Sequence, residues 1–164
     1  MSTQAHLTRT LSLAAIVASE AADLMATAKR VIEHSDGLIG DHLGQARRFD
    51  PLELRRLAAM IDGQRGLVNG LSANALVAVR LASSELSVAL AKALPSPTLE
   101  DGLTAEQQSA GRLLAGLTEL EGAIRGAQVQ MQEVSDSVSQ VAGRAEQGRV
   151  FEGLVGRLLR RRPR

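Results

Sequence analysis

Apolar residues recur along the chain in alternating steps of three and four, which is the spacing of one face of an α-helix. The first stripe consists of Leu7, Leu11, Ala14, Ala18, Ala21, Met25, Ala28 and Ile32. It predicts a helix over about residues 5–35. Gly37 stands where a glycine commonly ends a helix, so a short connector is expected over residues 38–48.

A second helix is predicted over residues 51–94. Asp50 is placed as its N-cap, Pro51 suits the first helical position, and Glu53 completes a capping-box pattern. The helix ends before Pro95, which cannot continue it.

The second half of this helix is apolar around most of its circumference. Between Gly66 and Ala91 the only charged residues are Arg80 and Glu85. A helix that is apolar all round is usually buried, so we expect it to lie centrally, against both other helices or a second subunit. Small residues in this helix predict a close approach of a neighbouring helix. Four polar residues among the apolar ones either fix the register of the helices or face the solvent. The small residues are Gly63, Gly66 and Gly70, and the polar ones are Gln64, Asn69, Ser72 and Asn74.

A third helix is predicted over about residues 104–148, because Thr104 and Gln107 form another capping-box pattern. Its apolar residues keep one unbroken heptad seam, which is a coiled-coil signal. The seam is Ala110, Leu113, Leu117, Leu120, Ile124, Ala127, Met131, Val134, Val138, Val141 and Ala145. The candidate interaction residues on it are Leu117, Leu120, Ile124, Met131, Val134, Val138 and Val141.

Residues 149–164 carry six arginines and one glutamate and predict a short, basic, amphipathic C-terminal helix. It can lie on an anionic membrane surface, contact a nucleic-acid backbone, or dock on the bundle or a partner. Docking is favoured, and specific nucleic-acid binding is the least favoured because no other predicted helix has a basic stripe. The candidate residues are Phe151, Leu154, Leu158, Arg160, Arg161 and Arg162.

Together these elements predict an all-α fold, an antiparallel and coiled-coil-like bundle of three long helices over residues 1–148, followed by the basic segment 149–164. Composition agrees, because 45% of the 164 residues are hydrophobic but only Phe49 and Phe151 are aromatic. The core must therefore be built from Leu, Val, Ile, Met and Ala, which suits helices packed along their lengths. The scarcity of aromatic residues also disfavours a stacking platform for single-stranded nucleic acid.

The chain contains no cysteine, which excludes disulfides, thiolate metal sites and thiol catalysis. No basic, apolar leader opens it and no uncharged apolar run is long enough to span a bilayer, so we expect a soluble, cytoplasmic protein, with peripheral membrane binding as the alternative. The formal net charge is +1, and the basic excess lies in the C-terminal segment.

Candidate chemistry is sparse. The densest cluster of ionisable residues is Glu33, His34, Asp36, Asp41 and His42, whose side chains could supply ligands for a divalent metal. Their spacing matches no metal motif, and polar residues at a helix end explain the cluster equally well. Nothing marks a catalytic pocket or a phosphate-binding loop, so we predict no enzyme activity, no cofactor and no metal.

Two short segments resemble known families. Residues 144–151, Arg-Ala-Glu-Gln-Gly-Arg-Val-Phe, preceded by a heptad seam, look like the approach to the cytoplasmic hairpin tip of bacterial chemoreceptors, although the returning helix is absent. Asn69-Gly70 within a long helix, followed by Pro97-Thr98-Leu99 and Asp101-Gly102, is similar to flagellar export chaperones. These resemblances imply a chemotaxis-linked coiled coil or a type III export chaperone as alternative functions.

The broad apolar face of the second helix exceeds what three helices joined by short loops need to bury. The sequence therefore predicts a non-enzymatic, bacterial-type helical interaction protein, acting as an adaptor, scaffold or chaperone. Its expected partners are one or more proteins, including a second copy of itself. The competing prediction is a peripheral binder of membranes or other surfaces that uses residues 149–162.

Overall fold

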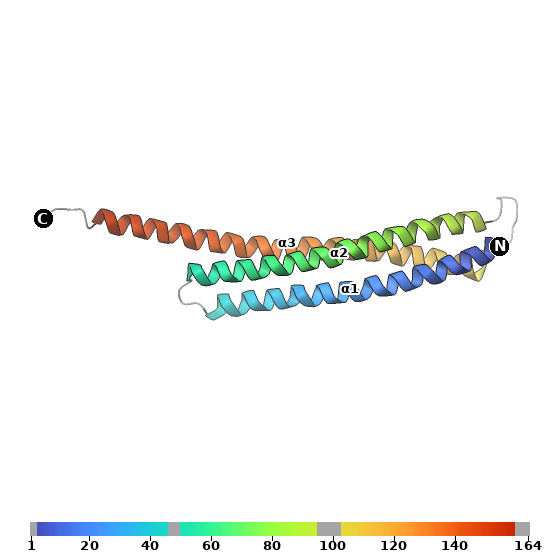
Figure 1. Ribbon diagram of the computed structural model, residues 1–164, viewed down its shortest axis with the longest axis horizontal. Helices are drawn as coiled ribbons and strands as arrows, with labels where there is room; N and C mark the ends of the chain where they lie inside the picture. The colour runs from blue at the N-terminus through green and yellow to red at the C-terminus, as the bar shows by residue number, and fades with distance from the viewer. Residues whose placement is uncertain (1–2, 46–49, 95–102, 160–164) are drawn as a thin grey trace. The chain divides into compact units, whose positions relative to one another are not determined.

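Three long α-helices make up the computed structural model, in the order α1 (Thr3–Gln45), α2 (Pro51–Ala93) and α3 (Ala105–Leu159) (Figure 1). The structure describes residues 3–45, 50–94 and 103–159, and the side chains of residues 3–41, 50–94 and 103–147. No strand occurs in these ranges. The prediction of an all-α bundle is confirmed.

The helices contribute segments to two units. Unit 1 combines Met1–Arg30 with Asn69–Gln128, and unit 2 combines Val31–Val68 with Val129–Arg164. Each unit therefore contains one segment of every helix. Contacts inside each unit show that α2 runs antiparallel to α3. In unit 1, Gln107 lies beside Ala93 while Glu121 lies beside Arg80.

Burial repeats every seventh residue along each helix, as a heptad pattern requires. The buried rows are Leu7, Ala14, Ala21, Ala28 and Ser35 in α1; Leu54, Ile61, Val68, Ala75, Ala82 and Ala89 in α2; and Ala110, Leu117, Ile124, Met131 and Val138 in α3. In α3, the second row of the predicted seam, which contains Leu120, Val134 and Val141, is half-buried. The heptad seam predicted in α3 thus faces the other helices.

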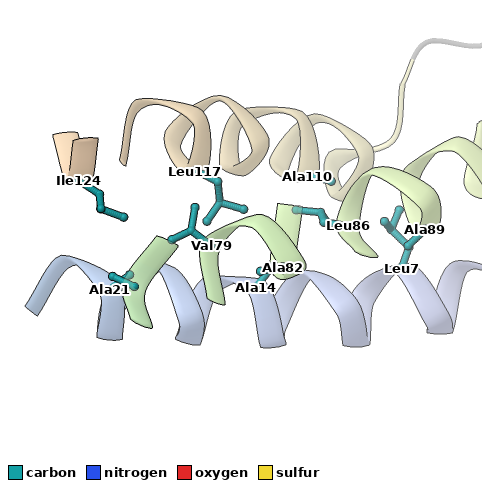
Figure 2. Packing of buried hydrophobic residues seen from close by; sticks show 11 residues of the cluster. Leu7, Ala14, Ala21, Val79, Ala82, Leu86, Ala89, Ala110, Leu117 and Ile124 are labelled. Atoms are coloured by element: carbon teal, nitrogen blue, oxygen red, sulfur yellow. The ribbon is translucent and has the colours of Figure 1, made fainter. Parts of the chain in front are cut away.

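The core of unit 1 combines alanines from all three helices with larger side chains that also come from all three. Ala14, Ala21, Ala75, Ala82 and Ala89 belong to this core together with residues as large as Leu117 and Ile124. In Figure 2, Val79 and Leu117 reach toward each other in the space between α2 and α3. Because alanine projects only a methyl group, α1 and α2 are able to pack closely, and branched residues fill the remaining volume.

The predicted end of the first helix at Gly37 is wrong. α1 continues through Gly37 and Gly40 to Gln45, and no described glycine has a positive φ. A glycine inside a helix costs about 1 kcal/mol relative to alanine, which packing on either side can offset. Here Ser35 is buried before Gly37 and Ile39 is half-buried after it, so the packed face extends through the glycine.

The predicted end of the third helix at Gly148 is also wrong. α3 runs without interruption to Leu159, so the residues expected to form a separate C-terminal helix continue α3 instead. A single glycine between good helix formers lowers helix stability without ending the helix. Arg160, Arg161 and Arg162 lie outside the described residues.

Both predicted helix starts are confirmed. The Asp50 carboxylate accepts a hydrogen bond from the backbone N–H of Leu52 at 3.1 Å, as an N-cap does. At α3, Thr104 and Gln107 form a reciprocal capping box. The Gln107 N–H donates to the Thr104 hydroxyl at 3.3 Å, and the Thr104 N–H donates to Gln107 Oε1 at 2.7 Å.

Gln107 has a second role that the sequence pattern does not reveal. Its Nε2 donates to the backbone carbonyl of Ala93 at 2.8 Å, so it also satisfies a carbonyl in the last turn of α2. The side chain is almost fully buried. One amide therefore joins the end of α2 to the start of α3.

We expect Gln107→Ala to lower the free energy of unfolding by about 1–3 kcal/mol, because it leaves a backbone donor and a backbone acceptor without partners. The matched control is Gln108→Ala, whose exposed amide bonds only to the Leu103 carbonyl, and it should change stability by less than about 0.5 kcal/mol. Urea denaturation followed by circular dichroism measures both. Equal effects at the two positions would contradict the joining role of Gln107.

The alanine row of α1 predicts a second pair of effects. Ala21→Leu should destabilise the protein by about 1–3 kcal/mol, because Ala21 is buried in the core of unit 1 and three more carbon atoms there would displace its neighbours. The neighbouring Ala22 is exposed, and Ala22→Leu should stay within about 0.5 kcal/mol of the wild type. Thermal unfolding compares the two variants, and an unchanged midpoint for Ala21→Leu would show that this core is loosely packed.

Candidate interaction surface

α2 carries most of the large apolar side chains that the bundle leaves exposed. Val77 is 69% exposed, Leu81 60% and Val88 50%. α2 does lie against both other helices, as expected, through Gln64 to α1 and Arg80 to α3, but within the single chain it buries one face and exposes another. The other exposed large apolar residues are Leu13, Ile16, Leu52, Met60, Leu67, Leu94, Leu103 and Val129.

The exposed residues of α2 follow their own heptad pattern. In unit 1 they recur in steps of four and three, and we call this row the outer seam: Gly70, Asn74, Val77, Leu81, Ser84, Val88 and Ala91. Every member is exposed and none is charged. Within unit 2, Met60, Gly63 and Leu67 are exposed with the same spacing. The outer seam spans about 32 Å of helix, at 1.5 Å per residue.

Glycines on this face meet open space. No heavy atom lies within 4 Å of the point where a Cβ would stand on Gly63, Gly66 or Gly70. The predicted close approach of a neighbouring helix at these positions is therefore wrong within the chain. Atoms of another molecule can therefore occupy the space beside these glycines.

On its α1 side, the outer seam borders an open groove of about 450 Å³. Ser84 and Val88 of α2 line this groove together with Leu13 of α1, and Arg9 and Glu85 add charge to it. The lining of the groove is more apolar than polar, and the groove is open to solvent. It widens the apolar surface of unit 1 from α2 onto α1.

On its α3 side, the outer seam borders a cluster of three charges. Arg80 donates to Glu121 Oε1 at 2.9 and 3.0 Å, and Arg125 donates to the same oxygen at 2.6 Å. Two guanidinium groups thus share one carboxylate.

In unit 2, the pKa of the exposed Arg55 guanidinium is raised by its hydrogen bond to Glu146 and by the charge of that carboxylate.

The predicted interaction residues of α3 pack within the chain. Leu117, Ile124, Met131 and Val138 are buried, and Leu120, Val134 and Val141 are half-buried. The side chains of Phe151, Leu154 and Leu158 and the whole of Arg160, Arg161 and Arg162 lie outside the described residues. These residues thus contribute to packing within the chain, and among the described residues α2 carries more of the exposed large apolar side chains than α1 or α3. A role of the α3 seam in binding partners stays a prediction.

The predicted cluster of ionisable residues near Gly37 lies along a continuous helix. Glu33, His34, Asp36 and Asp41 are exposed on α1, and the side chain of His42 is outside the described residues. Among the described side chains, no group of three histidine or acidic residues is close enough to hold a metal ion.

The polar residues of α2 divide into three kinds. Gln64 is half-buried and accepts a hydrogen bond from the buried Ser35 hydroxyl of α1. Ser72 is fully buried, and its hydroxyl has no hydrogen-bond partner among the described residues. Asn69 and Asn74 are exposed. Within the chain, only Gln64 has the register role expected of a buried polar group.

α1 and α2 also pass a test of length and composition for membrane-crossing helices, over Thr3–Asp41 and Pro51–Ala93. Core helices of proteins that never enter a membrane pass the same test. Within the most apolar 18-residue stretch of each helix, only 17% of the α1 stretch and 28% of the α2 stretch is buried. Much of both stretches is therefore uncovered in the single chain.

Neither a protein-family model, nor a curated protein, nor a solved structure matches this chain. The resemblances to chemoreceptors and to flagellar export chaperones thus gain no support from longer similarity. Function is inferred from the residues of this chain alone.

The two buried serines predict opposite effects. Ser72→Ala should raise the free energy of unfolding by about 1–2 kcal/mol, because it removes a buried hydroxyl without a partner and improves helix propensity. Ser35→Ala should lower it by about 1 kcal/mol or more, because Gln64 then loses its donor. Urea denaturation midpoints measure both changes, and the same sign at both positions would contradict the hydrogen-bond assignment.

Proposed function

We propose that the protein is a non-enzymatic helical interaction module, an adaptor, scaffold or chaperone, that binds protein partners through the exposed apolar face of α2. The observation that carries this proposal is the outer seam, an uncharged row of exposed positions beside a complete core. Val77, Leu81 and Val88 place large exposed apolar side chains along this row, and exposed apolar side chains gathered on one face are a mark of a binding site.

The chemistry of the surface supports recognition of helices over recognition of small molecules. The outer seam is long and linear, and its residues alternate in the steps of three and four that a partner helix presents. The neighbouring groove is open and shallow and contains few charged residues, so it offers little to enclose a small substrate. A partner helix would gain contacts along about 32 Å.

α2 and α3 also contribute differently to the core and to the exposed surface. α3 contributes its heptad seam to the core of each unit, and α2 contributes its buried row to the core and its outer seam to solvent. Partner binding on α2 therefore requires no opening of the bundle. A rigid surface loses less conformational entropy on binding than a segment that must first fold.

The proposal predicts that partner capture depends on the outer seam. A tagged full-length chain carrying Leu81→Gln and Val88→Gln should lose the proteins that the wild type captures by cross-linking in the cells that produce it. The reason is that two exposed apolar anchors become polar while the core stays intact.

The control variant is Val129→Gln, which removes an equally exposed apolar side chain from α3. It should capture the same proteins as the wild type. Mass spectrometry identifies the captured set, and circular dichroism verifies that all three proteins are folded. If the set were the same for all three, binding through the outer seam would be excluded.

A further inference from the structure

We infer that the partner of the outer seam is a second copy of this chain, with the two α2 helices packed in parallel and in register over Gly70–Ala91. This inference rests on the proposed function, because it names one occupant of the same surface. Three features of unit 1 support it: the small residues at three of the four d positions of the seam, the position of Asn74, and the charges of Arg80 and Glu85.

The outer seam has the two core positions of a coiled coil. Asn74, Leu81 and Val88 occupy its a positions, seven residues apart, and the d positions are Gly70, Val77, Ser84 and Ala91. Three of the four d positions, Gly70, Ser84 and Ala91, thus carry small side chains, and Val77 is the larger exception. Small residues at d allow two helices to approach closely, and the open space at Gly70 admits such an approach.

Asn74 is the only amide in the seam, and it occupies an a position. A single asparagine at an a position is known to specify register and oligomer state in parallel two-stranded coiled coils, because the two amides bond to each other only when the helices are aligned. Within the chain Asn74 is exposed, so its amide is accessible to a second copy.

The charges beside the seam match those of a second copy. Arg80 precedes Leu81 and is at a g position, and Glu85 follows Ser84 and is at the e position of the next heptad. In a parallel pair, g of one helix faces this e of the other, so Arg80 meets Glu85 twice, once on each side of the two-fold axis. The other flanking pairs, Ala73 with Ala78 and Ser87 with Lys92, bring no like charges together.

The surroundings of these two residues reinforce the match. Arg80 belongs to the cluster in which two guanidinium groups share Glu121, so this side of the seam has an excess of positive charge. Glu85 is on the opposite side, facing the α1 groove. An antiparallel pair would instead face g to g and e to e, and would not bring Arg80 to Glu85.

The first experiment measures the mass of the full-length protein by sedimentation velocity across the micromolar range. We expect a dimer for the wild type and for Val129→Lys, and a monomer for Leu81→Lys, because the last variant buries two ammonium groups against each other. Leu81 and Val129 are both exposed in the single chain, so both variants should keep the wild-type circular dichroism spectrum. A wild type that is monomeric throughout, or a dimeric Leu81→Lys protein, overturns the inference.

The second experiment tests the pairing of charges. Arg80→Glu alone and Glu85→Arg alone should each lose the dimer, since each brings like charges together at both contacts. An equimolar mixture of the two variants should form a heterodimer, because both of its contacts then join opposite charges. A mixture that stays monomeric while the wild type dimerises overturns the assigned contact.

The third experiment tests orientation by using the absence of natural cysteine. In a parallel pair, Val77→Cys and Ala91→Cys should each form an interchain disulfide on mild oxidation, because equivalent d residues face each other within disulfide range. The exposed Ala22→Cys of α1 is the control and should not cross-link. An antiparallel pair can bring at most one of the two α2 positions opposite its own copy, so a cross-link at only one of them overturns the parallel arrangement.

These outcomes are distinguishable from failure of the proposed function. If the wild type is a monomer but partner capture still depends on Leu81 and Val88, the occupant is a different protein, and only the self-pairing inference is lost. If the wild type is a parallel dimer and captures no other protein, the outer seam is an assembly surface, and the adaptor function is lost.

Discussion

The close packing of α1 against α2 through alanine is the contact on which the rest of this structure depends. Ala14 and Ala21 of α1, together with Ala75, Ala82 and Ala89 of α2, contribute only methyl groups to the core of unit 1. Small side chains bury little apolar area each, so the bundle gains stability by repeating the same contact over many turns. This is why the helices are long and why the heptad spacing is kept throughout.

Polar groups restrict this repetitive packing. A core of similar alanines has several registers of comparable stability, and specific hydrogen bonds select one of them. In unit 1, Gln107 fixes the end of α2 against the start of α3, and in unit 2, Ser35 bonds to Gln64 across α1 and α2. Ser72 has no such partner and represents a cost that the packing tolerates.

The fold could be predicted from periodicity and capping, because both are local signals. The start of α2 at Asp50, the start of α3 at Thr104 and the heptad seam of α3 were readable from the sequence. The helix ends at Gly37 and Gly148 were not, since whether a glycine ends a helix depends on packing beyond it. For the interaction surface, the apolar excess of α2 was visible, but its division into a buried and an exposed row depends on where α1 and α3 lie. For the same reason the sequence could not show that one row of the α3 seam is buried and the other half-buried within the chain.

α2 carries large apolar residues outside its buried face, and this has a consequence for the uniqueness of the fold. Leu81 and Val88 directly precede the buried Ala82 and Ala89, so turning α2 about its axis by one residue, about 100°, would bring leucine and valine to the places of these two alanines. Leucine and valine need more volume than the methyl group of alanine, so the turned helix would have to displace the side chains that surround Ala82 and Ala89 in the core. The alanines of the core of unit 1 thus favour one rotation of α2 over the other.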